Sequence, residues 1–517
     1  MPDTKKWMAF ILAIVFSASI MACQSTEIDN NPTTENKDKT TEEIKSSVVS
    51  TLGETTTTVT ENNDNETETS SLNNTDGSYK IERTTNKDGN ASDDFIKSLE
   101  GFELKILYPW KNTYANKKCK KYAETAKKNV QELYGVKIQE KSRYNNYDES
   151  LASEMAAKNC KHHIYYAKNT MFTDYFKSGY FANLIPAMRE SGVDLREPWY
   201  VSEATDFLNI DGKQLGWISS EEDFTMPYFI IYNKKLLNKK GLESPESLAQ
   251  QGQWTWDKLR EYAGKFYSDK NVSGFVGGGI NMLAAVAQQF DTQLTKIDKG
   301  TQPTTNLNDA NFADALSTYY DWTYGGSFWC ETFNGKKDSY AIKQFEKGKV
   351  AMLYGNYDDI KALKGKSVTK NIGVAPFPTK EESSGYTNIA EPEYVAFIPS
   401  VHQEQASKIL FLRNEYYRYN YSYSLKSLTS SLKTYLGDNE QTVTNIINIK
   451  LNKDGNNTDY CWTKFCEDVD AGITTEEIVN QIENGTYTST EAISKNKNAL
   501  TEAYANIWKR HRITGNV

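Results

Sequence analysis

The chain has 517 residues and a mass of 58.7 kDa, more than one hydrophobic core usually supports, so we expect at least two folded units. A mean hydropathy of −0.67 excludes a bundle of membrane spans, although it is compatible with one terminal apolar stretch. The formal net charge is −8 and no dense block of Lys and Arg occurs, so nucleic acid is not an expected partner.

Residues 1–22 have the order of a bacterial export signal. Two lysines precede an apolar run over residues 7–22, which is too short to span a membrane comfortably. The run ends in Ile-Met-Ala-Cys, which resembles the bacterial lipobox, in which the cysteine is lipidated and becomes the mature N-terminus. The resemblance predicts a lipid anchor at Cys23 on the outer face of the cell membrane, and no other membrane contact.

Residues 23–95 are predicted to form an acidic linker behind the lipidated Cys23. Between residues 24 and 80, 41 of the 57 residues are Ser, Thr, Asn, Asp or Glu, and only one is aromatic. A segment of this composition buries too little apolar area to offset the entropy of the chain. We therefore expect a disordered tether between the anchor and the folded part.

From residue 104 onward, strand and helix patterns alternate. The apolar runs predict strands over residues 104–108, 135–138, 163–166, 228–232 and 350–354. Helical spacing predicts helices over residues 117–134, 148–157, 173–178, 234–240, 256–267, 310–324 and 340–347, with Thr255 as an N-cap. Such alternation favours an α/β fold with parallel strands and helices on both faces of each sheet.

Four segments carry a resemblance to a known family. Residues 228–265 resemble the hinge-proximal signature of type 1, maltose-binding-like extracellular solute-binding proteins, with Tyr232-Asn233-Lys234 before a short helix and Thr255-Trp256 at a helix start. The other matching segments, in the same order as in that family, are residues 211–213, 345–352 and 372–378. The resemblance extends over roughly residues 103–510.

This resemblance implies a periplasmic-binding-protein-like type II fold, in which two α/β lobes joined by hinge strands close over a solute without breaking a bond. The expected first lobe comprises residues 96–226 and 376–440, and the second comprises residues 227–375 and 441–517, with crossovers near Met226 and Pro376. The implied function is capture of a small solute, a sugar or an oligosaccharide, by a monomer that delivers it to the permease of an ABC importer.

Candidate solute contacts are polar and aromatic residues in loops at the ends of predicted strands, because aromatic faces stack on sugar rings while amides and carboxylates bind hydroxyl groups. Tyr357 matches a position that maltose-binding members fill with a stacking tryptophan, whereas Met226 stands where they carry a ligand-bonding carboxylate, so the resemblance does not extend to a maltodextrin ligand. The candidates are Trp110, Tyr166, Asn169, Gly278, Asn281, Tyr354, Asn356, Tyr357, Glu391, Glu393 and Tyr394.

Two other functions stay open, a cell-surface polysaccharide-binding lipoprotein without a transporter and a secreted glycoside hydrolase. The hydrolase is disfavoured because Glu391 and Glu393 lie two residues apart on one segment, whereas a glycosidase needs two carboxyl groups that face one bond. Neither a metal nor a cofactor is expected, since the chain has four histidines and six scattered cysteines without zinc-site spacing.

Overall fold

The computed structural model describes residues 91–111, 114–210, 212–220, 225–269, 271–296, 303–325, 329–332, 339–466 and 474–514, with side chains up to residue 505. All of them belong to one unit of the chain, Leu72–Val517. The predicted export signal, the predicted anchor at Cys23, the linker up to residue 90 and Asp211 of the hinge motif lie outside the described residues. Helix α3 (Asp93–Lys97) begins within the last residues of the segment predicted to be linker.

In the described residues of the first lobe, a bridge joins two of the strand pairs. β1 (Glu103–Tyr108) pairs in parallel with β2 (Lys137–Ser142), and β3 (Tyr165–Lys168) pairs antiparallel with β13 (Tyr394–Phe397). A bridge between Ile106 and Ile164 connects the two pairs. The remaining elements of this lobe are α4 (Lys117–Tyr134), α5 (Tyr147–Ala156), η1 (Asn169–Met171), α6 (Phe172–Lys177), α7 (Leu184–Ser191), α8 (Ser202–Phe207), β4 (Asn209–Ile210), β5 (Lys213–Gln214) and η4 (Ser400–Gln405).

The second lobe contains a four-stranded sheet in the order β11-β6-β10-β7. Its strands are β6 (Phe229–Asn233), β7 (Ser273–Val276), β10 (Val350–Gly355) and β11 (Ile372–Ala375). The elements packed with it include α9 (Lys234–Lys239), α10 (Pro245–Gln250), α11 (Trp256–Gly264), α12 (Gly279–Gln288), α13 (Ala310–Thr323), α14 (Ser339–Glu346), α15 (Tyr357–Ala362), η3 (Ser367–Asn371) and α17 (Glu440–Lys450). Thr255 caps α11 as predicted, since its side chain accepts a hydrogen bond from the Lys258 amide at 3.3 Å.

The expected parallel pairing is present only in part, because both lobes contain parallel and antiparallel pairs. In the second lobe β7 and β10 are parallel, but β6 is antiparallel to both β10 and β11. β6 is the first strand after the crossover from the first lobe, and it runs in the direction opposite to that of the other three strands. One reversed strand in an otherwise parallel sheet is common in α/β proteins.

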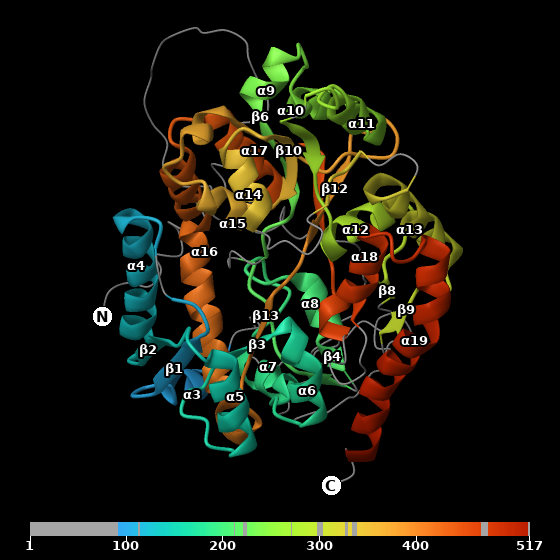
Figure 1. Cartoon of the computed structure of the whole chain (residues 1–517). Coiled ribbons are helices and arrows are strands. Elements are labelled where there is room, and N and C mark those ends of the chain that lie inside the picture. Colours follow the sequence, from blue (N-terminus) through green and yellow to red (C-terminus); the bar gives the residue numbers. More distant parts are fainter. Residues whose placement is uncertain are drawn as a thin grey trace, which may run out of the picture. The chain divides into compact units, whose positions relative to one another are not determined.

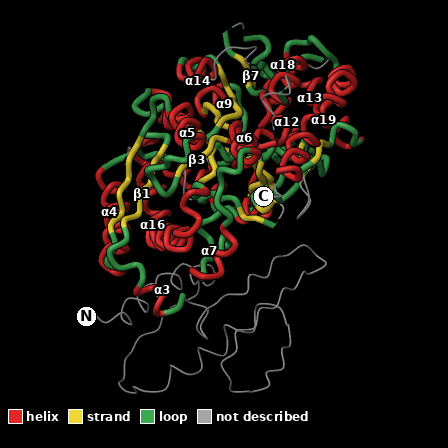
Figure 2. Tube along the Cα trace, turned by 90° about the horizontal axis from the view of Figure 1, so that it is seen from below, coloured by secondary structure: helices red, strands yellow, loops and turns green. Residues whose placement is uncertain are grey.

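Helix α16 (Ala406–Leu436) passes from one lobe to the other. Its first half is buried in the core of the first lobe, while Leu432 and Leu436 pack into the core of the second. Figures 1 and 2 show α4 alongside α16, where the Asn116 amide donates to Ser430 Oγ at 3.0 Å and to Thr434 Oγ1 at 2.8 Å. No helix of the described ranges is long and apolar enough to cross a membrane.

The remaining elements follow the lobes in the chain or bridge them. β12 (Tyr386–Ala390) pairs in parallel with β14 (Asn456–Tyr460), immediately before the chain returns to the first lobe at β13. A continuous aromatic core connects Phe172 and Phe207 to Trp462 and Phe465, with Phe207 and Trp462 stacked at 4.6 Å. The others are β8 (Thr295–Lys296), β9 (Thr304–Thr305), η5 (Thr463–Cys466), α18 (Thr475–Glu483) and α19 (Ser489–Thr514).

Candidate functional site

A cavity of about 510 Å³, here named chamber 1, lies between the lobes beside α16. The first lobe supplies the end of β1, the start of α4 and the start of β13, and the second supplies α15. Its volume is within the range of roughly 300 to 1,000 Å³ that is usual for small-molecule sites. The lining residues with aromatic or charged side chains include Trp110, Glu140, Tyr357, Glu393, Tyr394 and Arg413.

Four of the predicted solute contacts line chamber 1, and three of these are aromatic. Trp110 follows β1, Tyr394 begins β13, and their rings meet edge to face at 5.5 Å between centroids. Tyr357 enters from α15, and Glu393 precedes Tyr394 on the segment that returns to the first lobe. An apolar ring surface next to a carboxylate suits a ligand that has both C–H faces and hydroxyl groups.

Tyr166 lies behind this wall and does not line the chamber. It is fully buried, and its ring packs against Trp110 at 4.8 Å and against Tyr108 at 5.4 Å. Its hydroxyl accepts a hydrogen bond from the Arg413 guanidinium at 3.0 Å. Tyr166 therefore packs behind Trp110 in the wall of chamber 1.

Asn356 positions Tyr357 through a helix cap. Its side chain accepts hydrogen bonds from the backbone amides of Asp358 and Asp359. In return, the Asp359 carboxylate accepts a hydrogen bond from the backbone amide of Asn356 at 3.0 Å, which completes a capping box. Tyr357 is the first residue of α15, so this cap sets the direction in which its ring leaves the helix. Asn356 itself is not among the residues that line chamber 1.

Arg413 lines chamber 1 and was missed in the sequence. It lies on α16 with its side chain almost fully buried, and its guanidinium carbon stands 4.0 Å from the centre of the Tyr417 ring and 5.2 Å from that of Tyr416. Such cation–π contacts hold a buried cation in one orientation. The available signal was an arginine three residues before the tyrosine-rich run of residues 416–423, but no helix had been predicted there.

Glu140, at β2, is a second lining residue that the sequence analysis missed. Its carboxylate accepts a hydrogen bond from the Tyr108 hydroxyl at 2.9 Å and pairs with the Lys127 ammonium at 3.1 Å. Burial raises the pKa of Tyr108 and of Tyr416, so both hydroxyls keep their protons at neutral pH and stay hydrogen-bond donors.

Glu393 carries a perturbed carboxyl group in the chamber wall. Burial raises its pKa, and the neighbouring Asp358 and Glu391 carboxylates add to this rise, while the Lys168 ammonium opposes it. A carboxylate in this environment gains from hydrogen-bond donors brought by a ligand, because such donors favour its charged form.

Glu391, Asn169 and Asn281 form a cluster of their own instead of lining chamber 1. The Glu391 carboxylate accepts hydrogen bonds from Asn169 Nδ2 at 3.3 Å and from Asn281 Nδ2 at 2.6 Å, and it pairs with Lys464 Nζ at 2.9 Å. Burial alone would lower the pKa of Lys464, but the charge and hydrogen bond of Glu391 raise it. The cluster joins η1 of the first lobe to α12 of the second.

Gly278 and Tyr354 are likewise not among the lining residues of chamber 1. Gly278 has a φ of 142°, which favours glycine, and the Glu483 carboxylate accepts a hydrogen bond from the next amide, Gly279 N, at 2.6 Å. The start of α12 is thus occupied by this chain's own carboxylate. Tyr354 is buried against Tyr228, and its hydroxyl donates to the Asn281 carbonyl at 3.1 Å.

The described part of the chain contains no candidate metal site. In those ranges no group of three or more His, Cys, Asp or Glu side chains is placed to hold a metal ion. No disulfide joins any of the five described cysteines, Cys461 and Cys466 included.

The sequence matches the family described as bacterial extracellular solute-binding protein over residues 104–410, which is more than half of the chain. The chain belongs to this family. The predicted family and the two-lobed α/β fold are therefore confirmed, although the match ends at residue 410 and not near 510. Members of this family are extracytoplasmic solute-binding proteins. No curated protein matches this solute-binding protein.

Solved structures of other solute-binding proteins share the fold at low sequence identity. An ABC substrate-binding protein of Listeria monocytogenes in complex with cycloalternan is 16% identical, with a TM-score of 0.50, and the match covers 79% of this chain and 99% of that one. The GacH receptor of Streptomyces glaucescens, solved unliganded and with acarbose, is 16% identical, with a TM-score of 0.51 and coverage of 79% and 99%. The sugar-binding protein MalE of Xanthomonas citri is 15% identical, with a TM-score of 0.52 and coverage of 80% and 100%.

Proposed function

We propose that this solute-binding protein captures a sugar or an oligosaccharide in chamber 1 and delivers it to an ABC importer, while a lipid on Cys23 holds it at the outer face of the cell membrane. The observation that carries the carbohydrate assignment is the composition of the chamber wall. Trp110 and Tyr394 offer partly exposed ring faces, the buried Tyr357 borders the same space, and Glu393 and Arg413 offer hydrogen-bonding groups beside them.

The proposed mechanism is closure of the two lobes over the solute. Chamber 1 has walls from both lobes, so a solute that touches both walls stabilises the closed form by its differential affinity for that form. The importer would then recognise the closed form, and no bond of the solute would be broken. Structural neighbours support this solute class, since one is in complex with cycloalternan, another with acarbose, and a third is a sugar-binding protein.

The lipid anchor and the importer rest on other observations. The anchor is supported by the lipobox-like Ile-Met-Ala-Cys at residues 20–23, and the importer by membership of the solute-binding family. Metabolic labelling with a radioactive or clickable fatty acid tests the anchor: wild-type protein should take up the label, and Cys23→Ala should not. Equal labelling of both proteins would contradict the assignment.

A thermal-shift screen tests the proposed solute class. The full chain is heated in the presence of single mono- and oligosaccharides, with amino acids, dipeptides and polyols as comparison sets. A sugar at 100 times its Kd stabilises the native state by about 2.7 kcal/mol, which raises the melting temperature. A rise with the comparison sets alone would contradict a carbohydrate ligand.

A further inference from the structure

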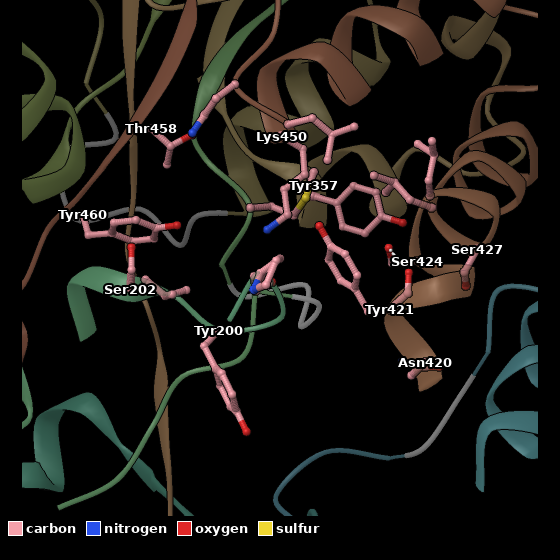
Figure 3. Close-up of a pocket in the computed structure, with 18 of the residues that line it drawn as sticks. Tyr200, Ser202, Tyr357, Asn420, Tyr421, Ser424, Ser427, Lys450, Thr458 and Tyr460 are labelled. Carbon is pink, nitrogen blue, oxygen red and sulfur yellow. Dashed lines mark hydrogen bonds between the residues drawn. The ribbon is translucent and has the colours of Figure 1, made fainter. Parts of the chain in front are cut away.

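A second cavity, of about 430 Å³ and here named chamber 2, adjoins chamber 1 along α16. Its walls come from the start of α8, the middle of α16, the end of α17 and strand β14. Figure 3 shows Tyr357 and Tyr421 in the middle of this space, with Ser202 and Tyr460 toward one side and Ser424 and Ser427 toward the other. None of the candidate contacts except Tyr357 lines it.

The two chambers share part of their lining, so they are adjacent. Tyr357, Asn420, Ser427 and Ser431 line both of them. Tyr357 therefore lies at the border between the chambers, where only 2% of the residue is exposed. A ligand that occupies both chambers would therefore pass Tyr357 and the three shared residues of α16.

One face of α16 lines both chambers with hydroxyl and amide groups. Asn420, Ser424, Ser427 and Ser431 are spaced by four, three and four residues, which places them on a single face of the helix. At 1.5 Å per residue, this polar stripe is about 16 Å long. Such a length exceeds one sugar ring and matches a chain of rings whose hydroxyl groups repeat along its edge.

The chambers differ in charge. Among the residues that line chamber 2, Glu203 and Lys450 are charged. The Lys450 ammonium donates a hydrogen bond to Thr225 Oγ1 at 2.8 Å. The rest of its polar surface consists of serine, threonine, tyrosine and asparagine side chains. Chamber 1 has three basic and three acidic side chains in its wall, namely Lys111, Lys361, Arg413, Glu140, Asp358 and Glu393.

We infer that the solute is an oligosaccharide that occupies both chambers, with one end among the charged groups of chamber 1 and an uncharged continuation in chamber 2 on the far side of Tyr357. This inference rests on the proposed function and deepens it by assigning chamber 2 as a binding site. Each chamber alone has the volume of a small-molecule site, so a monosaccharide fills only one of them. Stacking on Tyr421 and Tyr460 and hydrogen bonds to the α16 stripe would favour the longer ligand.

Two substitutions fill chamber 2 from opposite walls without touching chamber 1. Ser424→Trp acts from α16, and Ser202→Trp acts from α8. The matched control is Ser422→Trp, since Ser422 is exposed, lines neither chamber, and donates the same type of bond, to the Tyr419 carbonyl at 2.7 Å, that Ser424 donates to the Tyr421 carbonyl at 2.8 Å.

The test is calorimetric titration of the full chain and its three variants with cello-, malto- and chito-oligosaccharides of one to six units. We expect wild-type affinity to rise with length, and both chamber-filling variants to bind long sugars at least tenfold more weakly while short-sugar affinity and the melting temperature stay unchanged. The Ser422→Trp control should bind sugars of every length like the wild type.

Three outcomes would overturn the inference. Unchanged long-sugar affinity in both chamber-filling variants, or wild-type affinity that is independent of length, would remove chamber 2 from the site and leave the proposed function intact. Binding of no sugar by the wild type would overturn both. If one variant fails to fold, as judged by circular dichroism, the variant on the opposite wall decides.

Discussion

The Asn281 amide donates a hydrogen bond to the Glu391 carboxylate at 2.6 Å, across 110 residues of sequence. Both residues had been predicted to contact solute, and in the structure they contact each other. The same carboxylate pairs with Lys464, and only 10% of the Glu391 side chain is exposed. This cluster is therefore a structural tie at the return of the chain to the first lobe, and it makes a testable contribution to stability.

Glu391→Gln should lower the free energy of unfolding by about 2 to 4 kcal/mol, because it leaves Lys464 without its carboxylate and turns an acceptor toward the Asn169 and Asn281 amides into a partial donor. Urea unfolding followed by circular dichroism measures the change. A loss below 0.5 kcal/mol, a threshold about the size of a neutral surface substitution, would show that the cluster contributes little.

Glu393→Gln is the matched control, two residues further along the same segment. Burial raises the pKa of Glu393 in the folded state above its unfolded value, so its charged form opposes folding at neutral pH. The amide removes that charge, and stability should be unchanged or slightly higher. Sugar binding should weaken instead, because Glu393 lines chamber 1.

Asn356→Ala should cost about 1 kcal/mol of stability through the lost cap of α15, and it should weaken sugar binding because Tyr357 loses its fixed starting position. Asn356→Ser retains a capping side chain and should restore both properties. Stability and sugar affinity are measured on the same preparations. Restored stability without restored binding would indicate that the side-chain amide of Asn356 itself contacts the solute.

Trp110→Ala should weaken sugar binding at least tenfold, equivalent to about 1.4 kcal/mol, because it removes the ring face that packs beside Tyr394 in chamber 1. Tyr144→Ala is a suitable control, since Tyr144 is 58% exposed and does not line either chamber. Titration calorimetry compares the two variants. Equal affinities in both would remove Trp110 from the site.

Stability should fall on acidification below pH 6.5 through a histidine cluster in the first lobe. Burial lowers the pKa of His163 to about 4, and the nearby His402, Lys105 and His162 charges act in the same direction, while Glu103 opposes them. The unfolded chain therefore binds the proton first, and the His163 contribution is lost between pH 6.5 and about 4.

The expected loss from His163 is roughly 2 kcal/mol, after allowance for its partial exposure. Urea unfolding of the wild type and of His163→Gln at several pH values isolates this term, because the other titrating groups cancel in the difference. The free energy of unfolding of the wild type should fall relative to that of His163→Gln as the pH falls from 6.5 to about 4. A constant difference would contradict the assignment.

Much of the fold could be predicted because its elements carry local patterns. The strands β1, β6 and β10 are short apolar runs, and the helices α4 and α13 have apolar positions at helical spacing. Helix α16 has no such single pattern: residues 406–417 are buried on nearly every side in one lobe, and residues 418–431 are half exposed as the helix passes to the other. One 31-residue helix with two environments lacks a uniform apolar stripe.

The candidate site could be predicted only in part, for a related reason. Trp110, Tyr357, Glu393 and Tyr394 line chamber 1 because they follow strand ends at the edge where the lobes meet, which a chain-order argument can locate. Whether a polar residue there meets solute or another side chain depends on long-range pairing, as between Asn281 and Glu391. The roles of Arg413 and of the α16 stripe depend on a helix that the pattern did not reveal.

The most direct test of the central claim is a calorimetric titration of the full chain with the best sugar of the thermal-shift screen, followed by chromatography of the recovered sugar. The account predicts saturable binding of one sugar molecule per chain and recovery of that sugar chemically unchanged. Absence of saturable binding, or recovery of a cleaved or modified sugar, would contradict it.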